Sequence, residues 1–464
     1  MSARPQPGRW PRVCSSVTAA RISARRVAAV LVACGALGAV ALPGSAWLAR
    51  ASARSQQFMA AGDIGADLAV GDDGRAFLVT LGARRDPGRS VAVRVRSAAA
   101  GAGFGPALRV RRFGARRRDV QAGIAADGSG VIAVRAVRRT HRRVEVVSFD
   151  ARGRVNRAVT VSRGDAADLA ALEVAPSGAA VVVWFRHGQG GRWRLEAATR
   201  ESGSAAFGPA TPVSGFVRRP CCTSLSAAIG DRGDAVVTWT STSRPVVSAA
   251  MRGPGRGFRR PQMLTANAAD APRAAVGAGG TAAVLYSVQH VPPRPRDGLH
   301  LHRAVRSGPF GPPEQVNPGG GVTIGEATVT PGGRVLVAWI DRARASVHVS
   351  EAAPGGPLFD AGELGTDVAP ARVAVAADDD GAAAVAWTQL VSPQPVPRER
   401  AVAALRPGGG APFGRAIALG QPWRAASPET ARLLPHGGAL AVWRGDRFTG
   451  PARRRTALAV TRLP

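Results

Sequence analysis

Lysine is absent from this sequence, so all 62 of its basic residues are arginine. Acidic residues are also scarce, at 31, which leaves a formal net charge of +31 at pH 7. The lack of lysine beside abundant Ala, Gly and Pro is typical of a high-GC codon bias, but that bias does not explain the shortage of acids. A positive surplus of this size favours anionic partners.

Cysteine is nearly absent as well. Only Cys221 and Cys222 follow the first 53 residues, and because they are adjacent, a framework of several disulfides is excluded. Packing must therefore hold the fold together. Two neighbouring thiols cannot form a tetrahedral metal site alone and no histidine lies near them, so we expect no metal and no other cofactor. We expect the pair to form a disulfide that stiffens its loop, with a redox or ligand-contacting role as the alternative.

Helical periodicity is missing too, because the apolar runs are short, rich in β-branched residues and separated by Gly and Pro. What is present is a repeat of 47 to 56 residues, in which a tight turn ending in Gly precedes a Val/Ala-rich run. The turn glycines are Gly74, Gly128, Gly178, Gly233, Gly280, Gly333, Gly381 and Gly437. The residues six places further on are Thr80, Val134, Trp184, Trp239, Tyr286, Trp339, Trp387 and Trp443. Short strands at this period are typical of β-propeller blades.

The repeat predicts an all-β protein with a single closed β-propeller of four-stranded blades over residues 54–464. Eight blades are predicted, with seven as the alternative because Thr80 and Val134 break the aromatic pattern. The fourth strand of each unit is expected to begin at a Phe, as at Phe258, whereas the last unit ends without one. We expect a strand near Phe58 to complete the last blade, because closing the ring removes open sheet edges. The aromatic residues at the repeat position are predicted to form the core between blades.

Residues 1–53 have the features of an export signal or a signal anchor. Residues 1–26 are basic and contain no acid, and residues 27–49 form a long, mostly apolar run. That run is also long enough to span a bilayer if it is not cleaved, and this would be the only membrane contact. Either alternative places the propeller outside the cytoplasm.

In a propeller, the loops that lead into the innermost strands lie around the central channel, where ligand sites are usually built. The repeat register places a set of charged residues there: Arg118, Asp119, Asp168, Arg219, Asp270, Arg273, Glu326, Asp367 and Arg372. These are the candidate ligand-binding residues, and the same register places the expected disulfide of Cys221 and Cys222 beside them. With further arginines in neighbouring loops, they predict a positive rim that attracts an anionic glycan or cell-wall polymer. Export argues against nucleic acid as a partner, and we expect a monomer.

Two segments carry a family resemblance. The turn at 176–178 leads to Trp184 and the turn at 379–381 leads to Trp387, and this pattern resembles the sialidase-like β-propeller superfamily over roughly residues 58–464. The adjacent cysteines also look like a feature of exported members. The resemblance implies a propeller and, for catalysis, an arginine triad, a tyrosine nucleophile paired with Glu, and an acidic Asp. Here Trp follows the turn Gly at a longer spacing than in the sialidase motif, and the one tyrosine, Tyr286, lies at the repeat's aromatic position.

Three functions follow from these observations. The first is a non-catalytic binding or scaffold propeller at the cell envelope, because the repeats are regular and no catalytic motif is present. The second is a sialidase-like, glycan-cleaving hydrolase. The third is a redox protein that uses the cysteine pair.

Overall fold

The computed structural model describes part of the chain, all of it within one compact unit at residues 51–464. The described residues are 55–58, 63–83, 90–114, 119–138, 141–164, 167–217, 224–241, 246–265, 269–288, 297–317, 323–366, 368–392, 398–422, 425–435, 437–448 and 454–463. Within these ranges, no helix has the length and apolar character needed to cross a membrane. The predicted leader at 1–53 and its apolar run at 27–49 lie outside the described residues.

Eight separate four-stranded antiparallel sheets make up the fold, as the repeat predicted, and they are arranged as an eight-bladed β-propeller. Blade 1 consists of β2 (Asp63–Val70), β3 (Ala76–Ala83), β4 (Val91–Ala98) and β5 (Leu108–Phe113). Blade 2 consists of β6 (Val120–Ile124), β7 (Gly130–Arg138), β8 (His141–Phe149) and β9 (Val159–Thr160). Blade 3 consists of β10 (Ala167–Val174), β11 (Ala180–His187), β12 (Trp193–Arg200) and β13 (Thr211–Pro212), with a short 3-10 helix, η3 (Gln189–Gly191), between β11 and β12.

The other five blades follow the same order from the centre outwards. Blade 4 consists of β14 (Leu225–Ile229), β15 (Ala235–Thr240), β16 (Val247–Arg252) and β17 (Gln262–Met263). Blade 5 consists of β18 (Ala269–Val276), β19 (Ala282–Val288), β20 (Gly298–Ala304) and β21 (Glu314–Gln315). Blade 6 consists of β22 (Thr323–Val329), β23 (Val335–Asp341), β24 (Ser346–Ala352) and β25 (Phe359–Gly365). Blade 7 consists of β26 (Val368–Ala377), β27 (Ala383–Ser392), β28 (Arg398–Arg406) and β29 (Ile417–Ala418), and blade 8 of β30 (Ala425–Leu433), β31 (Ala439–Phe448), β32 (Arg454–Leu463) and β1 (Ser55–Phe58).

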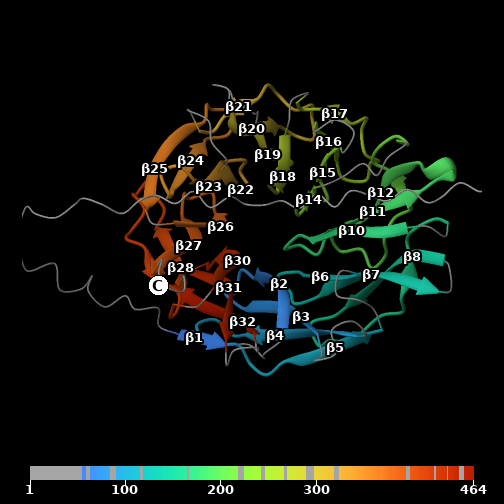
Figure 1. Cartoon of the computed structure of the whole chain (residues 1–464). Coiled ribbons are helices and arrows are strands. Elements are labelled where there is room, and N and C mark those ends of the chain that lie inside the picture. The colour runs from blue at the N-terminus through green and yellow to red at the C-terminus, as the bar shows by residue number, and fades with distance from the viewer. Residues whose placement is uncertain are drawn as a thin grey trace, which may run out of the picture. The chain divides into compact units, whose positions relative to one another are not determined.

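The ring closes through the N-terminal strand, as predicted. β1 is the outermost strand of blade 8 and runs antiparallel to β32, with Ser55 opposite Arg462 and Phe58 opposite Ala459. Figure 1 shows the innermost strands of the eight blades gathered around one centre, and each of them contacts the innermost strand of the next blade, including β30 with β2. Both ends of the propeller are thereby joined in a single blade.

The repeat glycines form the turns between the first and second strand of every blade. All eight have positive φ, from +74° at Gly74 to +91° at Gly333. A side chain is strained in this part of backbone space, which explains why glycine recurs there.

Eight apolar clusters fill the spaces between neighbouring blades, and the last of them joins blade 8 to blade 1. The repeat aromatics lie in these clusters, and Trp184, Trp387 and Trp443 are at most 1% exposed. The prediction that they form the inter-blade core is therefore confirmed. Val134 takes the same place between blades 1 and 2, which shows why blade 2 needs no aromatic residue there.

The expected start of the fourth strand was wrong except in blade 6, where β25 begins at Phe359. The Phe of the Gly/Pro loop stands before the strand: Phe258, for example, precedes β17. The fourth strand has only two residues in five blades. In three blades the Phe is followed by Gly-Pro, and proline has no N–H to donate to a sheet, so pairing begins later in the chain.

Candidate functional site

A cavity of about 550 Å³ lies at the centre of the ring. Residues from all eight innermost strands line it, from Asp67 on β2 to Arg432 on β30. Four of the lining residues are acidic and two are arginines: Asp67, Glu173, Glu326, Glu429, Arg372 and Arg432. The channel is thus a polar site in which negative charge is in slight excess.

Most of these charges are partnered by a neighbouring blade. Arg273 Nε lies 2.7 Å from Glu326 Oε1, which joins blade 5 to blade 6. Arg372 lies 3.6 Å from Glu429 and joins blade 7 to blade 8, while Arg432 lies 3.8 Å from Asp67. Desolvation nevertheless raises the pKa of Asp67 and of Glu326 above their ordinary values.

Uncharged polar side chains at the equivalent position of other innermost strands also link adjacent blades. The residue seven places before the turn Gly is polar in six blades and points to the next innermost strand in several of them. Gln121 Nε2 donates to the carbonyl of Ala170, and the N–H of Ala274 donates to Ser226 Oγ. Five innermost strands also carry a register shift near this position, and a β-bulge can redirect a side chain. Much of the polarity around the channel therefore serves to join blades.

Glu173 is different, because the described residues supply it with no hydrogen bond and no ion pair. It lies on β10 and is exposed to the cavity. Desolvation by the surrounding blades and the negative charges of Asp67 and Glu326 raise the pKa of Glu173 to about 8, against the opposing charge of Arg432. A carboxyl with this pKa is largely protonated at neutral pH and can donate a hydrogen bond or a proton.

Two candidate residues, Asp119 and Asp168, meet at a shared arginine between blades 2 and 3. Arg135 lies 2.7 Å from Asp119 through Nη2 and 2.7 Å from Asp168 through Nη1. Arg142 and His187 approach the other oxygen of Asp168 at 3.1 and 2.8 Å. Desolvation opposes the charged form of Asp168, but the hydrogen bonds from Arg135 and His187 and the charges of Arg142 and Arg135 prevail and lower its pKa. Both acids are held as ion-paired carboxylates.

The remaining candidates divide into described and undescribed residues. Arg273, Glu326 and Arg372 lie at or beside the channel. Asp270 lies on β18 opposite Ser287. Arg118, Arg219, Asp367, Cys221 and Cys222 lie outside the described residues, as does the expected disulfide. Asp67 and Glu173 were not among the candidates, although Asp67 stands at the same distance before Gly74 as Glu326 before Gly333.

Tyr286 is a core residue. It is 2% exposed, its hydroxyl oxygen lies 2.9 Å from His302 Nε2, and burial raises its pKa further above the ordinary value. It therefore has neither the access nor the ionisation that a sialidase-type nucleophile needs. In the described part of the chain, no group of His, Cys, Asp and Glu side chains could hold a metal ion.

A second hollow, of about 520 Å³, lies between the outer strands of blades 1 and 2. Its lining includes Arg111 on β5, His141 and Arg143 on β8, and Arg157 just before β9, against a single acid, Glu145. Arg111, Arg143 and Arg157 are exposed. We call this site the basic hollow. It carries a concentrated positive charge on the outer strands of blades 1 and 2, whereas the sequence predicted a ligand site around the central channel.

No protein-family model matches the chain, and no curated protein matches it. Among solved structures, it is similar to a PL25 ulvan lyase, with a TM-score of 0.47 and 9% identity over 87% of this chain and 95% of that one. It is also similar to a puromycin hydrolase, with a TM-score of 0.41 and 16% identity over 87% of this chain and 62% of that one. The Hadza microbial sialidase Hz136 matches with a TM-score of 0.34 and 9% identity over 59% of this chain and 62% of its own. These likenesses are distant and concern the fold alone; the propeller that the predicted resemblance implied is shown by the eight four-stranded sheets of this structure.

Proposed function

We propose that this protein is an extracytoplasmic propeller that binds an anionic glycan or cell-wall polymer without cleaving it. The observation that carries the proposal is the basic hollow, where three arginines and a histidine face one glutamate. Arginine suits this role, because its planar guanidinium can bind a carboxylate, sulfate or phosphate through two hydrogen bonds. The extracytoplasmic address rests on the export features of residues 1–53.

The positive surface extends beyond the hollow, which favours a polymer over a small anion. Arg109 and Arg112 are exposed on β5 beside Arg111. The turn at 150–154 carries the exposed Arg152 and Arg154, and Leu108 at the start of β5 approaches Gly153 in that turn. Asp150 in the same turn accepts hydrogen bonds from two backbone N–H groups, and these donors partly compensate the negative charge of its carboxylate. A surface of this kind attracts polyanions over a distance set by ionic strength.

Binding without turnover is supported by the state of the predicted acids. Asp119 and Asp168 are held by Arg135, and Glu326 is held by Arg273. Glycoside hydrolysis needs one carboxyl that gives a proton and a second, free carboxylate facing the same bond. Glu173 can give a proton, but the acids whose charges act on it are paired, Glu326 with Arg273 and Asp67 with Arg432. The redox alternative depends on Cys221 and Cys222, which lie outside the described residues.

The test is a titration of the full-length protein with polygalacturonate at low and high salt, with neutral dextran as the reference polymer. Replacing Arg111, Arg143 and Arg157 together by Gln should weaken binding by about tenfold or more, because three direct charge contacts are lost. The matched control replaces Arg256, Arg259 and Arg260 by Gln. These arginines are exposed on blade 4, so the control variant loses the same amount of charge at a different place on the surface. Equal loss in both triple variants would show a diffuse charge effect and sink the assignment to the hollow. Release of shortened polymer by the wild type would contradict the absence of turnover.

A further inference from the structure

A third hollow, of about 760 Å³, lies between blades 6 and 7. The outermost strand of blade 6, β25, forms one side, and the loop 410–415 of blade 7 forms the other. The turn at 380–381 and the end of β28 at Arg406 complete the lining. This hollow belongs to the face of the ring that carries the glycine turns, whereas the predicted ligand-binding residues were placed at the opposite face.

An aromatic residue at this hollow has no packing role in the fold. Phe359 is 54% exposed, whereas Phe104 and Phe310, which stand at the equivalent loop position in blades 1 and 5, are 7% and 6% exposed. In blade 6 the preceding residue, Leu358, takes that position and packs against the cluster between blades 5 and 6. Phe359 is therefore left outside the core at the edge of the hollow.

The strand that carries Phe359 is also unusual. β25 has seven residues, although the fourth strand has two residues in five of the other blades, and most of its side chains are exposed. Its register against β24 shifts twice, between Val347 and His348 and between Val349 and Ser350. Lengthened and irregular edge strands are typical of places where a sheet presents side chains to a ligand.

A second aromatic ring, Phe413 of blade 7, and a buried ion network that joins blades 6 and 7 also line the hollow. Glu351 is 3% exposed and binds Arg334 and Arg406, and the guanidinium of Arg406 lies 5.1 Å from the centre of the Phe413 ring. The Nη2 atom of Arg406 is buried and has no hydrogen-bond partner among the described residues. This part of the lining offers fixed polar groups beside an aromatic surface.

The charges of the lining nearly cancel. Three arginines, Arg334, Arg406 and Arg415, face four acids, Glu351, Asp360, Glu363 and Asp380. A polyanion would meet the carboxylates at close range, and a purely apolar ligand would cover charged groups without satisfying them. The fitting ligand is uncharged, has one apolar face for Phe359 and carries many hydroxyls for the carboxylates and guanidinium groups.

A pyranose ring has this combination, since its C–H groups form an apolar face and its hydroxyls both donate and accept. We propose that the hollow between blades 6 and 7 binds a neutral sugar unit of an oligosaccharide, with Phe359 as the platform under the ring. This site is separate from the basic hollow in position and in charge, and the inference does not depend on the proposed function.

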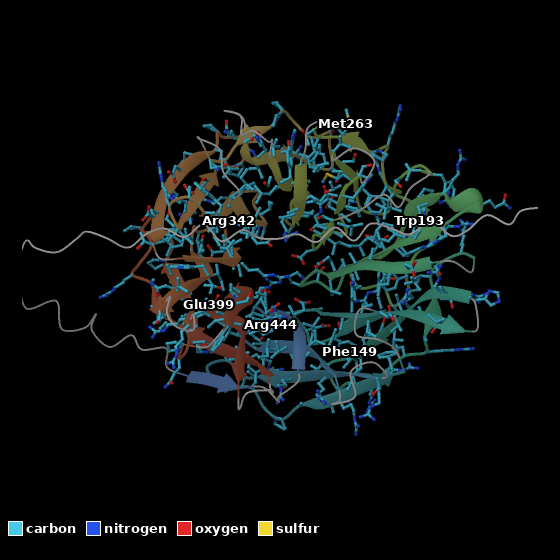
Figure 2. All side chains as sticks on the ribbon, viewed as in Figure 1. Phe149, Trp193, Met263, Arg342, Glu399 and Arg444 are labelled. Carbon is cyan, nitrogen blue, oxygen red and sulfur yellow. The ribbon has the colours of Figure 1, made fainter. Side chains whose placement is uncertain are left out.

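The experiment titrates the full-length protein with maltohexaose, cellohexaose and chitohexaose, followed by calorimetry and saturation-transfer NMR. We expect at least one of them to bind with a Kd in the millimolar range and Phe359→Ala to weaken it by about tenfold or more. Phe359→Trp should retain binding, because an indole offers the same apolar face. The control is Met263→Ala, which removes a 62% exposed apolar side chain on β17 at the outer edge of blade 4 (Figure 2).

Ionic strength separates this site from the other one. Binding of a neutral sugar should change little between low and high salt, whereas polygalacturonate binding at the basic hollow should fall steeply. Unchanged binding in Phe359→Ala would overturn the proposal, as would failure of all three oligosaccharides to bind. If the wild-type protein binds an oligosaccharide but does not bind polygalacturonate, only the proposed function is contradicted.

Discussion

Phe58 on β1 lies opposite Ala459 on β32, so a strand from the beginning of the propeller forms the outer edge of its last blade. Four residue pairs, from Ser55 with Arg462 to Phe58 with Ala459, join the two ends of the domain. Because the last two blades also share an apolar cluster and blade 8 packs on blade 1, this short strand completes a continuous ring.

Deleting residues 55–58 should therefore destabilise the propeller. The ladder between β1 and β32 is lost, and at a net 0.5 to 1.5 kcal/mol for each of about four hydrogen bonds the expected loss is roughly 2 to 6 kcal/mol. The exposed edge of β32 should also promote self-association. Urea unfolding and light scattering measure the two effects. Removal of residues 1–50, which belong to a different unit, is the reference deletion and should leave the unfolding midpoint unchanged; equal midpoints for both deletions would contradict ring closure.

The architecture was predictable because its signals are local. Gly233 forms a turn that needs positive φ, and Trp239 lies near the end of a strand that is buried on both faces. The turn glycine recurs in every blade and the aromatic residue in six of the eight. The length of the fourth strand was not predictable, because it depends on loop proline and on how far each edge extends. Blade 6 shows this: Leu358 and Phe359 exchange the roles of core and surface within one dipeptide.

Trp387 offers a test of how the repeat satisfies its buried polar atoms. The indole Nε1 of Trp443 donates to Thr461, and that of Trp339 donates to Ser350, at 3.1 Å in both cases. Each acceptor stands two residues after the cross-strand partner of its Trp. In blade 7 that position is Ala404, and Trp387 Nε1 is buried without a partner among the described residues.

Ala404→Ser should therefore stabilise the protein by about 0.5 to 1.5 kcal/mol, because a hydroxyl there can accept the indole proton. The reciprocal variant, Ser350→Ala, should lose about 1 to 3 kcal/mol, since it leaves the indole of Trp339 unsatisfied. Differential scanning calorimetry of both variants measures the effects. A destabilised Ala404→Ser protein would show that the tight space around Ala404 outweighs the new hydrogen bond.

The candidate site was harder to predict than the fold, because it depends on which blades meet across the ring. Asp67 and Glu326 each lie seven residues before their turn Gly, but Glu173 lies five residues before Gly178, and only the closed ring brings all three into one cavity. The sequence around an acidic residue also does not reveal which arginine it pairs with in the folded protein. Asp119 and Asp168 looked like ligand-binding residues, yet both are occupied by Arg135 from the adjoining strand β7.

Arg135→Gln should destabilise the junction of blades 2 and 3 by about 2 to 4 kcal/mol at neutral pH, because it leaves two largely buried carboxylates without their shared partner. Asp168 has a pKa below its ordinary value of 3.8, so its stabilising contribution is present above that pH and is lost as the pH falls through the lowered pKa. The difference between wild type and variant should thus shrink in acid. Arg142→Gln removes a more exposed contact to the same Asp168 and should cost less than about 1 kcal/mol. Urea denaturation as a function of pH checks both, and a pH-independent difference would argue against the ion pair as its source.

Glu173, in the central channel, should make the free energy of unfolding depend on pH. Its pKa is raised from 4.5 to about 8, so between these values the folded protein holds a proton that the unfolded chain has released. The free energy of unfolding should therefore fall as the pH rises through this window and level off above it. Glu173→Gln removes the unfavourable charge and should show a growing stability advantage over wild type as the pH is raised. A side-chain carboxyl NMR titration locates the pKa directly, and Asp72→Asn, which removes an exposed acid from the first turn of blade 1, is the control. If the wild-type and Glu173→Gln stability curves run parallel from acid to alkaline pH, the channel does not disfavour this charge.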